Sequence, residues 1–270
     1  MKLNEQQISQ YHEKGFLMIE NYLSEEEVGI LIEQLPNTIV KDSPRIILED
    51  NGSVRSVFAP HFTNDTYARL SRLNRLVMPA EQLINNKIYI HQYKINTKKG
   101  LKGEWWEWHQ DFPYWHIDDG ISKPDMVSVM IYLQDTNSSN GALMLIPETH
   151  KLGVVKFAEK EALAAAAEQN DNDYRSSLNA DIKFTVDHEL IRELSVANGI
   201  ITTAGEKGSV LFFHGNIFHA SNINLTPFDR DAILITYNSI DNLPQNKQNP
   251  RPDFLSGRDY SPIEDLVTTI

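Results

Sequence analysis

The chain has no cysteine among its 270 residues. This absence excludes disulfide bonds, thiolate metal sites, iron–sulfur clusters and a cysteine nucleophile. Basic residues are few compared with acidic ones, since 25 Lys and Arg stand against 37 Asp and Glu and leave a net charge of −12. An acidic chain repels a phosphate backbone, and no basic run offsets the charge, so we expect no nucleic-acid partner.

Long apolar stretches are also missing from the sequence. No segment approaches the ~18 uninterrupted apolar residues that span a bilayer, and the polar residues 1–7 lack the apolar stretch of a signal peptide. We therefore expect a cytoplasmic protein without a membrane partner. The sequence also has no phosphate-binding loop, no dinucleotide-binding glycine motif and no nucleophile elbow.

The length and the 41% of hydrophobic residues fit one large domain or two small ones. No repeat or low-complexity linker divides the chain, so we expect a single domain over residues 1–270. Residues 1–86 are expected to form a helical flank, with loops and short strands at 45–62. Ser24-x-x-Glu27 is a capping box that begins one helix, and the periodic segment 66–84 predicts another, kinked at Pro79.

Short strands are predicted from residue 87 onwards, where apolar and polar residues alternate. The segments are 87–95, 127–133, 142–146, 209–213, 217–221 and 232–237. An alanine-rich helix at 158–169 interrupts them within an insertion at about 155–200. Many short strands with polar turns favour a mainly β sandwich or barrel with flanking helices. We place the barrel at residues 87–240 and a separate C-terminal segment at 241–270.

The motif Trp108-His109-Gln110-Asp111-Phe112 could hold a metal ion. Residues i and i+2 of a strand project from the same face, so His109 and Asp111 could reach one cation. A further histidine would complete a face of two histidines and one carboxylate, which leaves open positions on octahedral iron(II).

Chance alone accounts for part of this signal. A chain with nine histidines and 37 acidic residues contains roughly one His-x-acid pair by chance, and this chain has two. The second pair, His116 and Asp118, runs into the turn Asp118-Asp119-Gly120, where we expect carboxylates to make local hydrogen bonds. The spacing by itself leaves the role of the first pair open.

Two histidines in the distal half of the chain, His214 and His219, are candidates for the third ligand. His214 lies where the chain turns after a predicted strand, whereas His219 lies within the returning strand, so His219 is the better donor. Arg230 follows eleven residues later, and its planar guanidinium could bind a carboxylate bidentately. Composition alone favours a simpler role for Arg230, a surface ion pair with Asp229 or Asp231.

Taken together, these motifs resemble the phytanoyl-CoA dioxygenase family, and most closely its ectoine hydroxylase branch and relatives that hydroxylate free amino acids. The resemblance extends over nearly the whole chain, at residues 11–16, 90–96, 108–120, 140–150 and 219–238. It implies a double-stranded β-helix, a jelly-roll barrel with a helical N-terminal flank, that uses iron(II), 2-oxoglutarate and dioxygen. It also implies that residues near 250–254 close the substrate pocket.

Site residues follow from the resemblance by position. The iron ligands would be His109, Asp111 and His219. Arg230 would bind the distal carboxylate of 2-oxoglutarate, with supporting hydrogen bonds from Gln92, Asn96 and Ser221. Halogenating relatives replace the carboxylate ligand with a small residue, so Asp111 implies a hydroxylase.

The substrate pocket matches the ectoine enzymes only in part. Trp115, Ser128 and Phe213 match pocket positions, but Leu234 stands where ectoine enzymes have an aromatic residue. Losing part of an aromatic cage disfavours a flat cation, so we expect a free aliphatic amino acid, leucine- or isoleucine-like, over ectoine. Arg251 would meet the substrate carboxylate.

Two alternative functions fit the sequence less well. A metal-binding or small-molecule-binding barrel without turnover would have no use for Arg230. A substrate carried on a carrier protein predicts a basic docking surface, which the net charge of −12 does not support.

Overall fold

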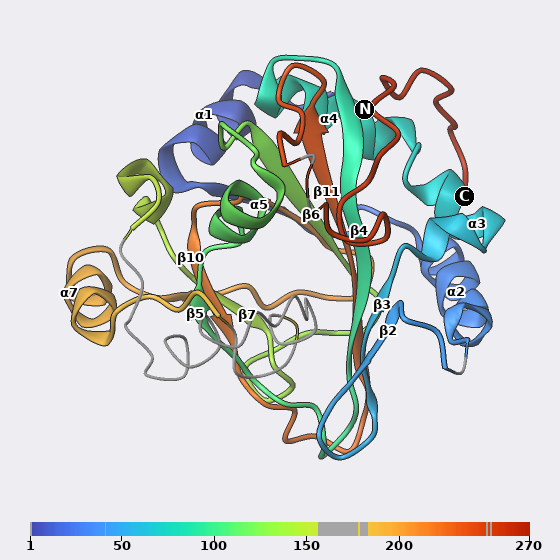
Figure 1. Ribbon diagram of the computed structural model, residues 1–270. Helices are drawn as coiled ribbons and strands as arrows, with labels where there is room; N and C mark the ends of the chain where they lie inside the picture. The colour runs from blue at the N-terminus through green and yellow to red at the C-terminus, as the bar shows by residue number, and fades with distance from the viewer. Residues whose placement is uncertain (1, 41, 156–177, 179–182, 247, 249) are drawn as a thin grey trace.

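The computed structural model describes residues 2–40, 42–155, 178, 183–246, 248 and 250–270. The helix expected at 158–169 lies outside the described residues. Two antiparallel sheets face each other (Figure 1). The larger has the order β1 (Phe16–Ile19), β9 (Val210–His214), β6 (Met126–Tyr132), β11 (Arg230–Ser239), β4 (Ile88–Lys98), β3 (Val54–Phe58) and β2 (Ile46–Leu48). The smaller has the order β5 (Trp106–His109), β10 (Phe218–Ser221), β7 (Leu143–Ile146) and β8 (Ile201–Thr202).

Four helices from the N-terminal flank pack on one face of the larger sheet and bury its main apolar core. They are α1 (Glu5–Lys14), α2 (Glu25–Gln34), α3 (Asp65–Leu70) and α4 (Asn74–Ile84). The predicted capping box of Ser24 and Glu27 is present at α2. The segment 66–84 forms two helices instead of one, because the chain breaks at Leu73, which bridges to Val267, while Pro79 lies inside α4.

The N-terminal flank also contributes strands to the sheet. Gly15 has φ +85 and ends α1 in the left-handed conformation that glycine adopts readily. The chain then continues as β1, which pairs with β9, while β2 and β3 extend the sheet beyond β4. β2 and β3 lie within 45–62, where short strands were expected, whereas β1 was not expected, because four apolar residues are too few to separate a strand from a helix by periodicity.

The two faces of β4 have different surroundings. Tyr93 and Ile95 belong to the apolar core under the helices. Successive side chains of a strand alternate between faces, so Gln92, Lys94, Asn96 and Lys98 lie on the opposite face, toward the smaller sheet. This inner face carries the polar residues of the predicted site.

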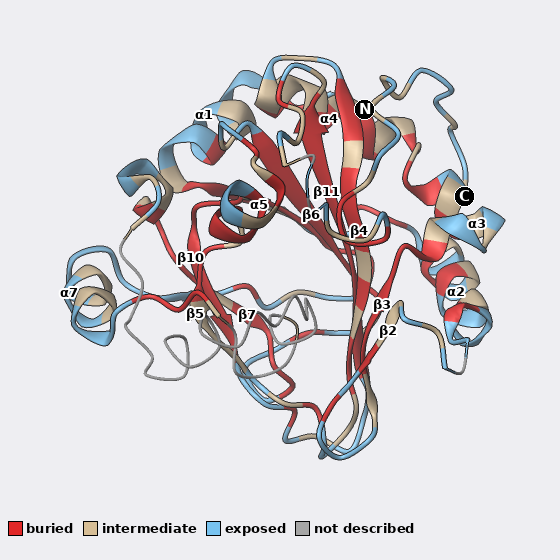
Figure 2. Cartoon of the chain, in the orientation of Figure 1, coloured by how far each residue is buried: buried red, intermediate tan, exposed pale blue. Residues whose placement is uncertain are grey.

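The remaining helices and the C-terminal segment lie around the sheets. α5 (Phe112–Asp119) follows β5, and α7 (His188–Asn198) lies at the outer side of the small sheet. Figure 2 shows that the central strands are buried, whereas α7 is largely exposed. The C-terminal segment packs on β4, where Gly257 N–H donates to the carbonyl of His91 and Ile263 N–H to that of Ile88.

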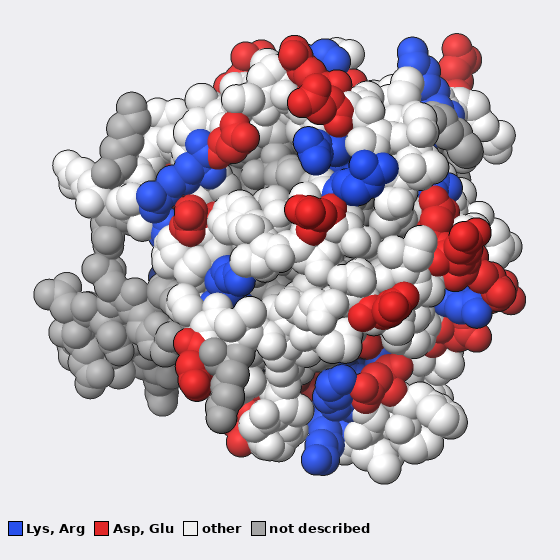
Figure 3. Space-filling view, turned by 90° about the vertical axis from the view of Figure 1, so that its right-hand side faces the viewer, with Lys and Arg blue, Asp and Glu red and all other residues white. Residues whose placement is uncertain are grey.

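The surface charges and the helix lengths were compared with what the sequence predicts. On the face drawn in Figure 3, Lys and Arg are interspersed with Asp and Glu, so its described residues form no continuous basic surface. Among the described helices, none has both the length and the apolar character needed to cross a membrane.

Candidate active site

Three candidate metal ligands meet between the two sheets. His109 ends β5, His219 lies in β10, and the two are direct cross-strand partners. Asp111 Oδ1 lies 3.6 Å from His109 Nε2 and 3.7 Å from His219 Nε2. One ligand atom from each residue lies within 4.8 Å of the others. One cation can therefore contact all three side chains.

Both histidines are oriented by the backbone. His109 Nδ1 lies 2.6 Å from the carbonyl oxygen of Glu107, and His219 Nδ1 lies 3.0 Å from that of Ile217. A ring nitrogen at this distance donates its N–H to the carbonyl, which leaves Nε2 as the unprotonated nitrogen. Each ring thus presents Nε2, the atom nearest Asp111, to a metal.

The charge state of the cluster also suits a cation. Burial lowers the pKa of His219 to about 4, so its ring is neutral at pH 7. Burial would raise the pKa of Asp111, but the neighbouring His219 and His109 rings and Lys94 hold it below its ordinary value. An ionised carboxylate beside an uncharged imidazole is the state in which these groups bind metal. Two imidazoles and one carboxylate are the donor set that non-haem iron(II) accepts.

The local geometry at Asp111 differs from the prediction. His109 and Asp111 were expected on one face of a strand, but β5 ends at His109. Asp111 has helical dihedrals (φ −75, ψ −39) and directly precedes α5, with Pro113 in the first helical turn. The expectation of a continuous strand was wrong because a helix begins here, and the side chains meet at the strand-to-helix turn.

Two buried cations lie side by side in the barrel. Arg230 begins β11 and is the cross-strand partner of Lys98, at the end of β4, and each residue is 2% exposed. Arg230 donates to the carbonyl of Gly141, and Lys98 Nζ donates to those of Glu104 and Asn222 at 2.5 and 2.6 Å. In the part of the chain that the structure describes, neither cation forms an ion pair with a carboxylate.

The surface ion pair that composition favoured for Arg230 is therefore not formed. Asp229 pairs with Lys99 instead, and Arg230 lies inside the barrel. Burial lowers the pKa of Arg230 to about 10 and lowers that of Lys98 well below its ordinary value. Two cations that are costly to bury and form no ion pair among the described residues fit a carboxylate supplied by a ligand.

Ser221 adds an unused hydrogen-bonding group to this region. It lies two residues after His219 on β10, and its Oγ is buried without a hydrogen-bond partner among the described residues. The next residue, Asn222, provides the carbonyl that Lys98 contacts. A buried hydroxyl left unpaired is costly unless a ligand satisfies it.

Gln92 and Asn96 lie at different depths along the inner face of β4. Asn96 is one inward-facing position from Lys98, and its Oδ1 accepts a 2.8 Å hydrogen bond from Ser56. Gln92 is three such positions away, opposite Thr236, and donates to the carbonyl of Leu255 at 2.8 Å. Asn96 is thus near the buried cations, whereas Gln92 is near the C-terminal segment.

Residues expected to line the substrate pocket lie close to the metal cluster. The Phe213 ring packs edge-on against the His219 ring at 5.5 Å, and Ser128 is the cross-strand partner of Phe213. Leu234 belongs to the same inner apolar cluster as Phe213. Trp115 lies on α5, next to Gly215, where an added Cβ would come within 3.0 Å of its ring. Ser128, Phe213 and Leu234 therefore share the barrel interior, whereas Trp115 belongs to a separate apolar cluster around α5 and packs edge-on against the His91 ring.

Arg251 is held by a buried carboxylate of α5. Its Nε lies 2.8 Å from Asp119 Oδ1 and its Nη2 lies 2.5 Å from Oδ2. His91 Nε2 also lies 3.1 Å from Asp119 Oδ2. The expectation that Asp119 makes only local hydrogen bonds was wrong, because α5 ends at Asp119 and directs its side chain inward to partners distant in sequence.

Three positively charged side chains were missed in the sequence: Lys98, described above, Lys94 and Arg55. Lys94 shares the inner face of β4 with Gln92 and Asn96, and its charge lowers the pKa of Asp111. Gln92 and Asn96 were predicted from the family resemblance, whereas the alternation along 87–95 places Lys94 on the same face and could have identified it.

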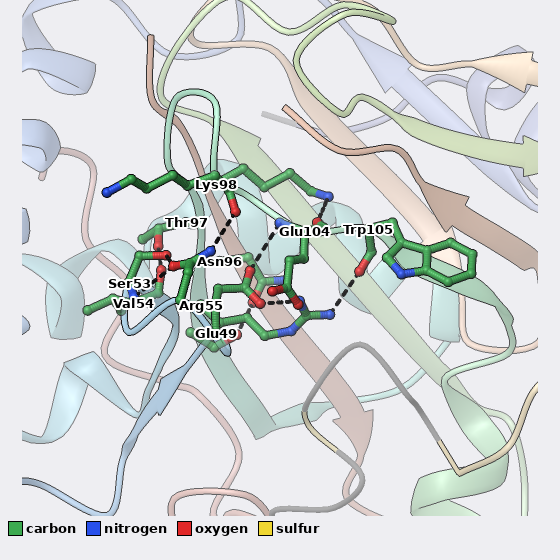
Figure 4. A network of polar contacts seen from close by, with 12 residues as sticks. Glu49, Ser53, Val54, Arg55, Asn96, Thr97, Lys98, Glu104 and Trp105 are labelled. Atoms are coloured by element: carbon green, nitrogen blue, oxygen red, sulfur yellow. Dashed lines mark hydrogen bonds and ion pairs between the residues drawn. The ribbon is translucent and has the colours of Figure 1, made fainter. Parts of the chain in front are cut away.

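Arg55 carries no comparable sequence signal. It is 1% exposed, pairs with Glu49 at 2.7 Å, and stacks 3.7 Å above the Trp106 ring, which lies 6.3 Å from the His109 ring. Figure 4 shows Arg55 with Glu49, Glu104 and Lys98, brought together by the strand ends and the loop before β5.

Known proteins provide an independent comparison. The model of the phytanoyl-CoA dioxygenase family matches residues 11–232. An L-proline trans-4-hydroxylase of Streptomyces griseoviridis is 34% identical over 94% of this chain and 92% of its own length. An ectoine dioxygenase of Bordetella bronchiseptica is 33% identical over 95% of this chain and 83% of its own length.

A solved structure shares the fold. EctD from S. alaskensis with 2-oxoglutarate and 5-hydroxyectoine superposes with a TM-score of 0.78 at 29% identity, over 95% of this chain and 84% of that chain. The expected double-stranded β-helix is thereby confirmed. The chain belongs to the phytanoyl-CoA dioxygenase family and is an iron(II)- and 2-oxoglutarate-dependent dioxygenase, as the sequence resemblance predicted.

Proposed function

We propose that the enzyme hydroxylates an unactivated C–H bond of a small free amino acid or amino-acid derivative, with His109, Asp111 and His219 as iron ligands. The convergence of the three ligand atoms carries this proposal. Iron(II), 2-oxoglutarate and dioxygen supply the oxidation, in which 2-oxoglutarate becomes succinate and carbon dioxide while a C–H bond becomes C–OH. The protein binds and orients the reactants and excludes water.

Cosubstrate binding is assigned to the two buried cations. Arg230 offers a planar fork to the distal carboxylate of 2-oxoglutarate, and Lys98 lies beside it in the next strand. The unpaired hydroxyl of Ser221 and the side chain of Asn96 are the supporting polar groups. Gln92 was grouped with them in the sequence, but its place opposite Thr236 and beside Leu255 favours contact with the substrate.

Substrate binding is assigned to the region around Phe213 and the C-terminal segment. Phe213, Leu234 and Trp115 would contact the apolar part of the substrate, and Ser128 with Gln92 would orient its polar part. Arg251 would receive the carboxylate. The residues of the C-terminal segment close the pocket in this proposal.

The identity of the substrate is narrowed by the relatives. Two of them are named for L-proline and ectoine, both small ring compounds. The leucine-like preference predicted from the sequence depends on Leu234 and is not supported by these names, so L-proline and ectoine become the first candidates and leucine the third. A non-catalytic binding barrel is disfavoured by membership of a dioxygenase family.

A substrate panel tests the proposal directly. The iron-loaded protein is given 2-oxoglutarate and L-proline, ectoine, L-leucine or L-isoleucine, and succinate release is compared with the mass of the product. We expect one of them to gain one oxygen atom with one succinate released per product. Succinate release at the same uncoupled rate with every compound, and no hydroxylated product, would contradict the proposed substrate class.

A further inference from the structure

The buried carboxylate of Asp119 is surrounded by two donors from distant parts of the chain. Asp119 is 2% exposed, and it accepts from Arg251 Nε, Arg251 Nη2 and His91 Nε2. Burial would raise the pKa of Asp119, but these hydrogen bonds hold it at about 2, so the carboxylate is ionised at neutral pH. The backbone carbonyl of Asp119 also accepts from the N–H groups of Gln245 and Asn246. Asp119 therefore fixes both the side chain of Arg251 and the chain leading to it.

A second line of hydrogen bonds holds His91 in place. Burial lowers the pKa of His91, so the ring is neutral, and its Nε2–H donates to Asp119. Its Nδ1 then accepts from the Tyr89 hydroxyl at 3.5 Å, and that hydroxyl accepts from Asn238 Nδ2 at 2.9 Å. All four groups are buried within β4, β11 and α5. The donors therefore point in one direction, toward the carboxylate, and give it a single orientation.

Asp119 occupies only one edge of the Arg251 guanidinium. A guanidinium has five N–H donors, and Asp119 takes the edge formed by Nε and Nη2. Nη1 has no hydrogen-bond partner among the described residues, so the other edge, formed by Nη1 and Nη2, can donate to a second carboxylate. Arg251 is 11% exposed in its side chain, in contrast to 1% for Asp119, so solvent reaches the arginine and not the aspartate.

Arg251 also lines a cavity. Its volume is about 420 Å³, and its lining includes Asp119, Gln245, Arg251, Ser256, Arg258 and Tyr260. The cavity is large enough for a small amino acid, and its two guanidinium groups favour an anionic end over a neutral one. Arg258 is tied to the same wall because its Nη2 donates to the carbonyl of Arg251 at 3.1 Å.

We propose that Asp119, oriented by His91, is a positioning residue that fixes Arg251 by one edge of its guanidinium so that the other edge receives the substrate carboxylate. This inference rests on the proposed function, since it requires a substrate with a carboxylate. Asp119 itself does not touch the substrate; it sets the angle at which Arg251 meets it. Selectivity for an acid over its uncharged analogue is then the property that depends on Asp119.

The test compares the hydroxylation of a substrate amino acid with that of its carboxamide, in the wild type and in a variant that lacks the Asp119 carboxylate. The probes are the amino acid that the wild type hydroxylates and its amide, such as L-proline with L-prolinamide or L-leucine with L-leucinamide; for ectoine, the probe is the ring without its carboxyl group. Asp119→Asn removes the charge that holds Arg251. Asp118→Asn is the matched control, because this substitution removes the same charge one residue away. The Asp118 carboxylate lies 3.7 Å from Lys183 Nζ and acts on Arg251 through its charge, without a hydrogen bond to it among the described residues.

We expect Asp119→Asn to lower kcat/KM for the acid at least tenfold, mainly through KM, and to change kcat/KM for the uncharged analogue less than threefold. The ratio of kcat/KM for the acid to kcat/KM for the analogue should fall strongly in Asp119→Asn and stay close to the wild-type value in Asp118→Asn. The KM for 2-oxoglutarate should be unchanged in both variants. His91→Phe removes one hydrogen-bond donor to Asp119 and leaves Arg251 unchanged, so it should lower this ratio by a smaller factor. It replaces Asp119→Asn as the test variant if that variant does not fold.

Two results would overturn the inference. An equal loss for acid and analogue would give Asp119 and His91 a purely structural role. A wild type that hydroxylates none of the panel would instead remove the proposed function and this role with it, and that outcome is visible before any variant is made.

Discussion

His109 and His219 face each other as cross-strand partners of two short antiparallel strands, with ring centroids 4.1 Å apart. Each ring donates Nδ1–H to the backbone carbonyl two residues earlier in the chain. The same hydrogen bond in both strands therefore points both Nε2 atoms at one place, where Asp111 completes the cluster. The convergence of the two Nε2 atoms therefore follows from strand pairing and from these two backbone hydrogen bonds.

The first prediction concerns the metal. His109→Ala, Asp111→Ala and His219→Ala should each remove most of the bound iron, because two remaining ligands bind far more weakly than three. Iron per protein chain, measured by atomic spectroscopy after desalting, checks this. His214→Asn is the control, since His214 packs against His150 and lies outside the cluster. Iron lost from the control and kept by His219→Ala would refute the assignment of the third ligand.

The second prediction concerns Arg230. Arg230→Ala should raise the KM for 2-oxoglutarate about thirtyfold or more and change the KM for the prime substrate much less. The reason is that removing one partner of a buried charge pair costs on the order of 2–5 kcal/mol. Arg192→Ala, at an exposed arginine paired with Glu189, is the control and should have no effect. An unchanged dependence on 2-oxoglutarate would give Arg230 a structural role alone.

The third prediction concerns stability in the presence of cosubstrate. Arg230 and Lys98 repel each other while no carboxylate lies between them, so 2-oxoglutarate should stabilise the fold beyond its effect on the metal. At a concentration 100 times its Kd, a ligand of the native state adds about 2.7 kcal/mol. Thermal unfolding of iron-loaded protein under nitrogen, with and without 2-oxoglutarate, measures the shift in Tm. Arg230→Ala should lose most of it; a shift equal to that of the wild type would argue against this binding mode.

The fourth prediction concerns acid. Burial lowers the pKa of His214 to about 3 and that of His61 to about 4 in the folded state. Because the folded pKa lies below the unfolded value of about 6.5, these neutral histidines contribute their full stability above that pH and lose it as the pH falls toward the folded pKa. At pH 5 each should cost on the order of 2 kcal/mol.

Urea unfolding between pH 8 and pH 5 measures this loss. Asp119 enters only at lower pH, since its pKa of about 2 and the ordinary value for aspartate both lie below 5. His214→Gln and His61→Gln should each make the free energy of unfolding less dependent on pH. A slope unchanged in both variants would assign the acid sensitivity to other groups.

The fold and much of the site could be predicted from the sequence wherever the local residue pattern and the family resemblance indicated the same element. The alternation at 87–95 predicted β4, and the short strands around His219 and Arg230 lie where they were expected. The helix α5 was missed because Trp108 to Gly120 mixes aromatic and acidic residues without a clear period. Asp119 was misread for a related reason: its partners, His91 and Arg251, are 28 and 132 residues away, and only tertiary structure brings such groups together.

β4 uses different residues for packing the apolar core and for lining the site. In its second half, Tyr93 and Ile95 pack under the helices, while Gln92, Lys94 and Asn96 lie on the inner face; a register shift opposite Thr236 and Tyr237 reverses this alternation, so that Ile88 and Ile90 pack under the helices. Substitutions at Gln92 or Lys94 can therefore change what the enzyme accepts with little effect on the apolar core. A library confined to alternate positions of this one strand, with its partners Thr236 and Leu234 on β11, is a compact route to new specificities, and divergence among natural relatives can follow the same path.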